Sequence, residues 1–210
     1  MKNNGQHLVA REGWLPVGIV LILSFLGKIY LGWVAFIILF IFFLALCYIF
    51  RDPKRTIPSA PLAVVSPCAG EIVAVEKVTD PWLNRPAIRC RIRMSIWNVH
   101  ILRSPIEGKV MDQWYSDGKE QGVKKRYSYW IKTDESDDVI LSLALGRGAL
   151  LAKMGIHCGE RTGQGQNSGF LYFSGLIDVL VPENARIEIK EGDYVLSGQS
   201  VLAQFIHASG

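Results

Sequence analysis

The residues most suited to chemistry in this chain are one serine and one histidine. Ser174 lies between Phe173 and Gly175 in the segment GFLYFSGLIDVLVP. A serine hydroxyl becomes a useful nucleophile only when a base, held in place by a third group, removes its proton. His100 is the candidate for that base, because imidazole exchanges a proton near neutral pH. A histidine without a carboxylate partner is more often structural, so both interpretations of His100 stay open.

Arginines supply a second kind of chemistry, the recognition of an anion. A guanidinium group holds a carboxylate or a phosphate through paired, charge-assisted hydrogen bonds. The candidates for contact with an anionic headgroup are Arg51, Arg55 and Arg103. Three more alternate with apolar residues and would share one face of a strand: Arg89, Arg91 and Arg93. That face is either a solvated surface or a contact for anionic lipid, and each candidate has the alternative of an ordinary surface charge.

Charge and cysteine content narrow the classes of partner. The formal net charge of +4 is modest, and the basic residues are not interleaved with aromatic residues as in proteins that bind single-stranded nucleic acid. Nucleic acid is therefore not expected as a partner. The four cysteines, at 47, 68, 90 and 158, form no Cys-x-x-Cys pair. The sequence thus indicates no metal site and no disulfide framework, and reduced thiols are typical of a cytosolic domain.

The elements that must position these residues are mainly strands. Short apolar runs rich in β-branched residues recur between turn signals, at 63–78, 87–96, 108–116, 127–133, 138–146, 169–182 and 185–205. Helical periodicity is weak there, with at most a short segment at 148–154. We therefore expect residues 51–210 to form one compact, mainly β domain.

A hydrophobic N-terminal region precedes this domain. After a polar stretch at 1–13, residues 14–50 are apolar except for an interruption at 27–32, which predicts a helical hairpin. A membrane span needs about 20 apolar residues. The second segment of the hairpin about meets this length, whereas the first is nearer to a re-entrant or interfacial piece. A cleaved signal peptide is disfavoured, because no small-residue cleavage site follows. We expect a retained membrane hairpin.

The basic residues that flank the hairpin predict its orientation. Lys2 and Arg11 precede it, and Arg51, Lys54 and Arg55 follow it. The excess of positive charge on the cytoplasmic side of membrane proteins therefore places both ends in the cytoplasm.

The two ends of the β domain share a pattern of glycine turns and short valine strands. SPCAGEIVAV opens the domain and GDYVLSGQSVLAQF closes it. Lipoyl and biotinyl modules of the barrel-sandwich type have such halves, so barrel-sandwich-like halves are expected here. A carrier module would also need a lysine at the tip of a hairpin. No convincing lysine is present, and a structural or carrier module stays only as an alternative.

Four stretches together resemble the short, prokaryotic-type phosphatidylserine decarboxylases over nearly the whole chain. Phe50 to Pro53, with Arg55 and Pro58, is similar to the family signature that follows its membrane segment. SPCAG at 66–70 is similar to Ser-Pro-Ala-Asp-Gly. The stretch at 94–108 resembles Met-Ser-Pro-x-Asp-Val-His-x-x-Arg-x-Pro. Residues 159–182 align without a gap on the segment that ends Phe-Gly-Ser-Arg-x-Asp-x-x-x-Pro.

The resemblance implies a decarboxylase that makes its own pyruvoyl group by breaking the chain between glycine and serine. In this chain the order is inverted, because Ser174 stands where the family has glycine and Gly175 where it has serine. Ala69 and Asn98 stand where the family has aspartates. Leucines replace family arginines at 150, 151 and 176.

We therefore expect a membrane-anchored protein of the phosphatidylserine decarboxylase family with a degenerate catalytic centre. It would act in bacterial phospholipid metabolism at the cytoplasmic face of the inner membrane, by binding an anionic or amino phospholipid or a partner enzyme. No cofactor is expected, and a pyruvoyl group only if Ser174 is processed. The alternative is an active phosphatidylserine decarboxylase that forms its pyruvoyl group at Ser174 and makes phosphatidylethanolamine.

Overall fold

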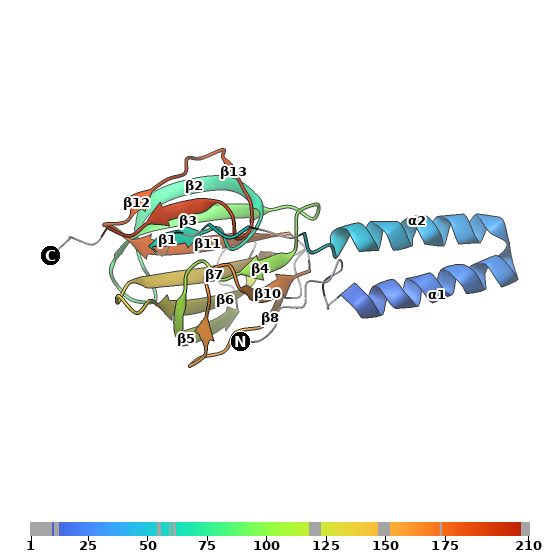
Figure 1. Cartoon of the computed structure of the whole chain (residues 1–210), viewed down its shortest axis with the longest axis horizontal. Coiled ribbons are helices and arrows are strands. Elements are labelled where there is room, and N and C mark those ends of the chain that lie inside the picture. Colours follow the sequence, from blue (N-terminus) through green and yellow to red (C-terminus); the bar gives the residue numbers. More distant parts are fainter. Residues whose placement is uncertain are drawn as a thin grey trace. The chain divides into compact units, whose positions relative to one another are not determined.

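The structure, a computed structural model, describes residues 10, 13–53, 56–58, 60, 62–117, 123–146, 152–172 and 174–206. The chain divides into two compact units, Met1–Lys54 and Arg55–Gly210. The first unit contains two helices, and the second contains the strands (Figure 1).

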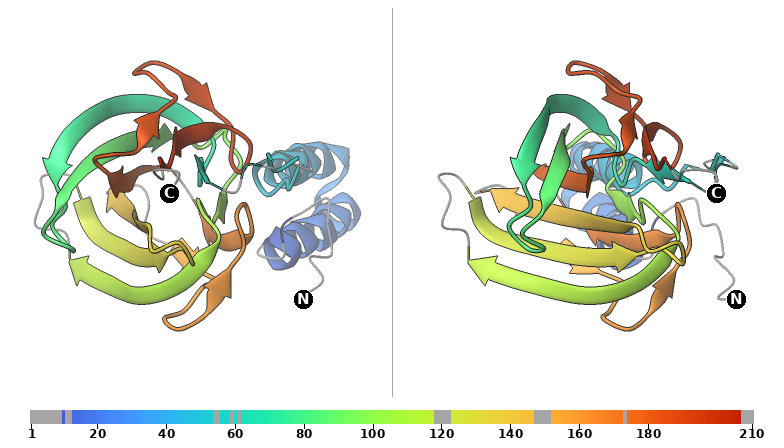
Figure 2. Two further views of the ribbon diagram at one scale, coloured as in Figure 1. Left: turned by 60° about the vertical axis from the view of Figure 1, so that its left-hand side comes forward. Right: turned by 90° about the vertical axis from the view of Figure 1, so that its left-hand side faces the viewer.

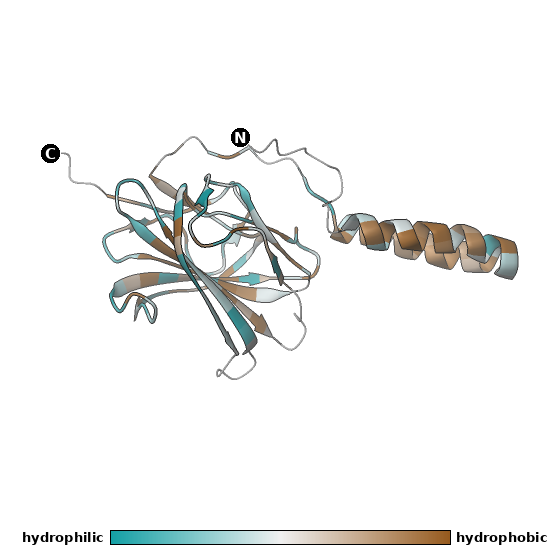
Figure 3. Cartoon of the chain, turned by 90° about the horizontal axis from the view of Figure 1, so that it is seen from below, coloured by the Kyte–Doolittle hydropathy of each residue, from teal (hydrophilic) through white to brown (hydrophobic). Residues whose placement is uncertain are grey.

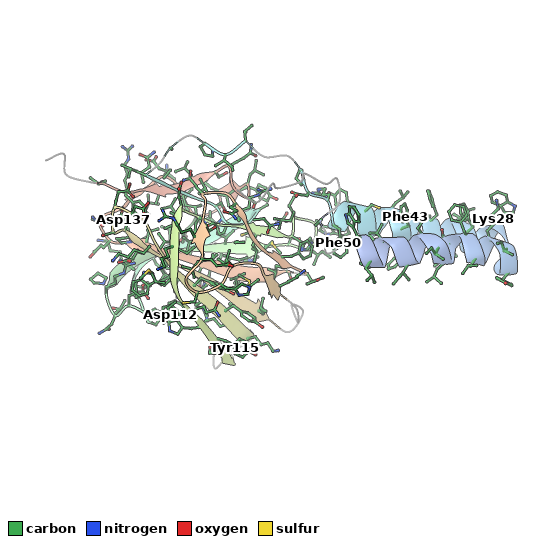
Figure 4. All side chains as sticks on the ribbon, turned by 60° about the horizontal axis from the view of Figure 1, so that its bottom comes forward. Lys28, Phe43, Phe50, Asp112, Tyr115 and Asp137 are labelled. Carbon is green, nitrogen blue, oxygen red and sulfur yellow. The ribbon has the colours of Figure 1, made fainter. Side chains whose placement is uncertain are left out.

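The helical unit is an antiparallel hairpin, as the sequence predicts. Helix α1 spans Trp14–Leu31 and helix α2 spans Trp33–Ile49. They are joined by Gly32, whose φ of +86° and ψ of −171° lie in a region open essentially to glycine alone. Beside this turn the ammonium of Lys28 lies 4.2 Å from the centre of the Trp33 ring. Figure 4 shows Lys28 at this end of the hairpin and Phe50 at the other.

Apolar side chains cover the outside of the hairpin. Large hydrophobic residues along both helices are exposed, including Leu15, Ile29, Val34 and Ile41, and Figure 3 shows both helices as mostly hydrophobic. The helices have 18 and 17 residues. Among the described residues, no helix combines the length and the apolar character needed to cross a membrane. The expectation that the second segment approaches a full span is therefore not supported.

The second unit is mainly β, which confirms the predicted class. Its eight-stranded sheet has the order β13-β2-β3-β11-β7-β6-β5-β9 and curls into a half-barrel (Figure 2). The strands of this sheet are β2 Gly70–Thr79, β3 Pro86–Met94, β5 Gly108–Asp117, β6 Val123–Lys132, β7 Asp138–Gly146, β9 Arg161–Thr162, β11 Gly175–Pro182 and β13 Tyr194–Val195.

Two small sheets complete the domain. One has the order β1-β14-β12, and the other has the order β4-β10-β8. Their strands are β1 Ala63–Val65, β4 Ile101–Arg103, β8 Ala152–Met154, β10 Asn167–Leu171, β12 Arg186–Ile187 and β14 Val201–Gln204. The possible helix at 148–154 is wrong for 152–154, which pair with β10 as a strand, and 148–151 lie outside the described residues.

The two glycine-rich ends of the domain pair with each other. β1 pairs with β14, opposing Ala63 and Gln204, and β13 pairs with β2, opposing Tyr194 and Glu71. The sequence suggested barrel-sandwich-like halves, whereas the structure shows a half-barrel sheet with β13 at one edge and a separate small sheet that contains β1 and β14. The pairing of the two ends brings Ser66, after β1, into backbone hydrogen bonds with Gly198 and Ser200.

Strand β3 separates two faces of the large sheet. Its apolar residues Ile88, Cys90, Ile92 and Met94 belong to the main core, which also takes residues from both small sheets. The alternating arginines lie on the opposite face, which we call the outer face, as the alternation predicts. A second, smaller apolar cluster lies on this face around Ala87, Ile140 and Leu180.

Carboxylates neutralise three arginines on the outer face. Arg91 donates two hydrogen bonds to the buried Asp178 of β11, at 2.7 and 2.9 Å. Arg126 of β6 lies 3.4 Å from the same carboxylate and donates to Ser142 at 3.0 Å. Arg89 pairs with Glu76 at 2.6 Å. Because Arg89 and Arg91 have protein partners, they are poorly suited to binding lipid headgroups.

We predict that the Arg91–Asp178 pair contributes strongly to stability. Arg91→Ala should lower the free energy of unfolding by about 3 kcal/mol, because it leaves a buried carboxylate with one remaining partner. Arg89→Ala is the matched control and should cost less than about 1 kcal/mol, because Glu76 is exposed. Urea unfolding followed by circular dichroism measures both. Equal costs would show that Asp178 does not depend on Arg91.

Candidate functional site

The motif residues of the sequence converge on one region of the β domain. The backbone N–H of Arg103 donates to the carbonyl oxygen of Pro67 at 2.8 Å, and that of Leu171 donates to the carbonyl of His100 at 2.9 Å. In the large sheet, Gly175 is paired with Met94. Segments 66–70, 94–103 and 163–171 and the residue Gly175 are therefore joined by these hydrogen bonds and by the pairings of β4 with β10 and of β3 with β11.

His100 is buried at the start of β4, and both of its ring nitrogens face backbone carbonyls. Nδ1 lies 2.7 Å from the oxygen of Leu171, and Nε2 lies 2.9 Å from the oxygen of Ile96. A neutral imidazole donates to only one of these oxygens, and its tautomer decides which. Both nitrogens are directed at backbone carbonyls in this arrangement and not at a serine hydroxyl.

The two positions that lost aspartates are in direct contact. The side-chain amide of Asn98 donates to the carbonyl oxygen of Ala69 at 3.0 Å. Its oxygen accepts a hydrogen bond from the hydroxyl of Tyr194 at 2.7 Å. Asn98 therefore ties the 66–70 segment to β13. The side chain at 98 is thus a neutral amide bonded to the backbone at 69, at two positions where the resemblance implied aspartates.

The cleavage position lies at the first residue of β11. Gly175 is partly buried, and a Cβ built on it would lie 3.1 Å from Cδ2 of Leu171 and 3.5 Å from the oxygen of Ala144. A side chain here would require Leu171 to give way by a few tenths of an ångström. Ser174 precedes the strand and is partly buried, and Phe173 lies outside the described residues. Leu171 thus contacts both Gly175 and the ring of His100.

Arg103 lies near His100 in the chain, but its side chain reaches other segments. Its Nη1 donates to the carbonyl oxygen of Gly165 at 3.0 Å. Its Cδ would be 2.6 Å from a Cβ built on Gly198, so the arginine packs closely over that glycine. Arg103 therefore joins β4 to the turns at 163–166 and 197–200.

The other two candidate arginines lie elsewhere in the chain. Arg51 belongs to the helical unit, where its Nη1 donates to the oxygen of Tyr48 at 3.2 Å and its guanidinium lies 3.8 Å from the centre of the Tyr48 ring. Arg55 lies outside the described residues. Arg51 therefore contacts a residue of its own helical unit, Tyr48.

The described residues include no group of histidine, cysteine and acidic side chains that could hold a metal ion.

Burial raises the pKa of the Cys68 thiol, and it raises the pKa of Cys90 to about 12. Both thiols therefore stay protonated and unreactive at neutral pH.

Sequence reasoning missed three residues that shape this site. Leu171 and Tyr194 make the contacts described above. Ser197 donates toward the carbonyl oxygens of Pro67 and Ile101, at 3.2 and 3.3 Å. Tyr194 lies 96 residues beyond Asn98, and Ser197 lies 130 residues beyond Pro67 and 96 beyond Ile101, so no local spacing could have indicated them.

Comparison with known proteins shows the family of the chain. A family model described as phosphatidylserine decarboxylase matches residues 42–203. A protein of Nitrosomonas eutropha named phosphatidylserine decarboxylase proenzyme is 36% identical over 206 residues, covering 94% of this chain and 95% of its own length. Proteins of the same name from Aromatoleum aromaticum and Cupriavidus metallidurans are each 34% identical; the alignments cover 97% and 96% of this chain and 99% and 97% of theirs. No solved structure matches the chain.

The chain therefore belongs to the phosphatidylserine decarboxylase family, and the resemblance seen in its motifs is confirmed.

We predict that His100 stabilises the fold. His100→Ala should lower the free energy of unfolding by about 3 kcal/mol, because it opens a cavity and removes the partner of buried carbonyl groups. His157→Ala, at an exposed position, is the control and should change stability by less than about 0.5 kcal/mol. Thermal unfolding of both variants measures the difference. A His100→Ala protein as stable as the parent would contradict a structural role.

Proposed function

We propose that this chain acts in phospholipid metabolism by binding an aminophospholipid, and that it does not form a pyruvoyl group. The observation that carries this proposal is Gly175 at the cleavage position. Glycine has no hydroxyl, so the step that breaks the chain in this family has no nucleophile there. The residues present therefore do not fit the pyruvoyl group at position 175.

The surroundings of Gly175 support the same proposal. The nearest candidate base, His100, has both nitrogens directed at backbone carbonyls. Carboxylates that would orient it are missing at 69 and 98, where Asn98 instead bonds to the Ala69 backbone. A serine placed in this region would have no organised base, and the loss of one member of such a set removes most of the rate.

The active decarboxylase is the second candidate, and the comparisons by themselves favour it. The relatives that match almost the whole chain are named phosphatidylserine decarboxylase proenzyme. In this chain the only hydroxyl at the pair is that of Ser174, one residue before the usual position. This candidate requires Ser174 to reach the Phe173 carbonyl and to find a base other than the engaged His100.

Membrane association through the helical hairpin is part of the proposal. Exposed apolar side chains along α1 and α2 support it, because such a surface is costly in water. The flanking basic residues favour the cytoplasmic face of a bacterial inner membrane. Arg51 of the helical unit, and Arg55 and Arg103 of the second unit, are each proposed as contacts for lipid headgroups. A partner enzyme of phospholipid synthesis is the other class of ligand.

We predict that the purified protein is a single uncleaved chain of 23.5 kDa by intact-mass spectrometry. Ser174→Gly with Gly175→Ser should restore little cleavage, because no base is organised beside the new serine. Adding Ala69→Asp and Asn98→Asp to that variant should increase cleavage. The control carries Ala69→Asp and Asn98→Asp but keeps Ser174 and Gly175. A fragment of the parent protein that begins at residue 174 and lacks a free amine would establish the active decarboxylase instead.

We also predict that Arg103 determines lipid preference. Arg103→Ala should reduce the preference of the full chain for phosphatidylserine over phosphatidylcholine vesicles by about tenfold or more, even at high salt, because a charge-assisted hydrogen bond is lost. Arg93→Ala, at an exposed strand position, should act only at low salt, because salt screens surface charges beyond about 8 Å. Co-sedimentation across a salt series measures both. Equal binding of both lipids by the parent protein would favour a protein partner.

A further inference from the structure

The turn between β3 and β4 presents large apolar side chains to solvent. Ile96 is 43% exposed and Trp97 is 63% exposed. Tyr194 of β13 is 59% exposed and bonds through its hydroxyl to Asn98 of the same turn. By contrast, the outer-face tryptophans Trp82, Trp114 and Trp130 pack against an apolar cluster. We call Ile96, Trp97 and Tyr194 the turn patch.

The turn is held rigidly in this exposed position. The backbone N–H of Asn98 donates to the oxygen of Ser95 at 3.1 Å, which closes the turn. The ring of His100 holds the carbonyl of Ile96, and the Asn98 side chain holds the carbonyl of Ala69. The turn therefore keeps the side chains of Trp97 and Ile96 largely exposed to solvent. Apolar groups fixed in this way are typical of a contact surface.

The turn patch borders the candidate site. His100 and Asn98 contact both the turn and the segments that carry the degenerate motifs. Compared with the family pattern, isoleucine replaces proline at 96 and asparagine replaces aspartate at 98. The first change adds apolar surface, and the second removes a negative charge. Both changes lower the cost of placing this turn against an apolar, anionic surface.

One basic and one acidic residue lie beside the patch. Arg93, near the end of β3, lies opposite Glu71 of β2, and Glu71 in turn lies opposite Tyr194. Attraction between this patch and a charged partner is therefore weak. The aromatic rings and the isoleucine carry the recognition, and tryptophan and tyrosine favour the boundary between lipid headgroups and acyl chains.

We propose that the turn patch inserts into the headgroup region of a phospholipid bilayer and holds the candidate site at the lipid surface. This inference rests on the proposed function, because an aminophospholipid ligand resides in a bilayer. The site would then meet its ligand without extracting it into water. Because the contact is apolar, it should form on neutral lipid and persist at high salt.

The test uses the full chain bound to phosphatidylcholine vesicles, with and without brominated acyl chains that quench tryptophan at short range. The parent protein is compared with Trp97→Phe, so that the difference reports on Trp97 and the tryptophans of the hairpin cancel. A matched control moves the tryptophan to β5 by combining Trp97→Phe with Tyr115→Trp. Tyr115, labelled in Figure 4, is 53% exposed, and its ring centre lies 5.0 Å from that of Tyr127 on the neighbouring strand.

We expect brominated lipid to quench the emission contributed by Trp97 and to leave that of the tryptophan moved to position 115 unchanged, at low and high salt alike. Vesicle-bound protein in which Trp97 is not quenched would overturn the inference and would favour a protein partner at the turn patch. Co-sedimentation of the same samples separates this failure from a failure of membrane association. Whether the chain is cleaved is measured separately by mass spectrometry and does not affect the quenching result.

Discussion

The register of β11 is the constraint on which the rest of the β domain depends. This strand is paired with β3 along its whole length and with β7 along most of it. In this register Ile177, Val179 and Val181 enter the main core. Asp178 faces the opposite side, where Arg91 and Arg126 neutralise it. The pairing that builds the sheet therefore also places Ser174 and Gly175 at the beginning of this central strand.

This constraint bears directly on the inverted serine and glycine. Moving Ser174 into the place of Gly175 would require β11 to slip by one residue, which turns every side chain to the other face. The slip would carry the Asp178 carboxylate into the apolar core and expose three core residues. A buried, unpaired carboxylate costs several kcal/mol. The fold thus resists the simplest route by which Ser174 could replace the missing hydroxyl.

Three polar side chains of the candidate site form hydrogen bonds with the backbone. His100, Asn98 and Arg103 each bond to carbonyl oxygens of neighbouring segments. Such bonds satisfy buried carbonyl groups that would otherwise be costly, and they fix the turns that border the site. Residues suited to proton transfer and anion binding can therefore persist for structural reasons. The bonds of His100 and Asn98 also hold the turn patch in its exposed position.

Local sequence alone determined a large part of this protein. Alternation in β3 predicted which of its side chains face the core, and the apolar run at 14–50 predicted two helices. The order of Ser174 and Gly175 showed that position 175 has no hydroxyl group. These properties depend on neighbours within a few residues, whose directions follow from strand and helix geometry. The tertiary structure alone decided which partners meet. Arg91 lies 87 residues from Asp178, and Asn98 lies 96 residues from Tyr194. Such contacts arise from the pairing order of the strands, which joins segments whose spacing in the chain has no period. The sequence could therefore identify the arginines and the histidine, but it could not identify their partners.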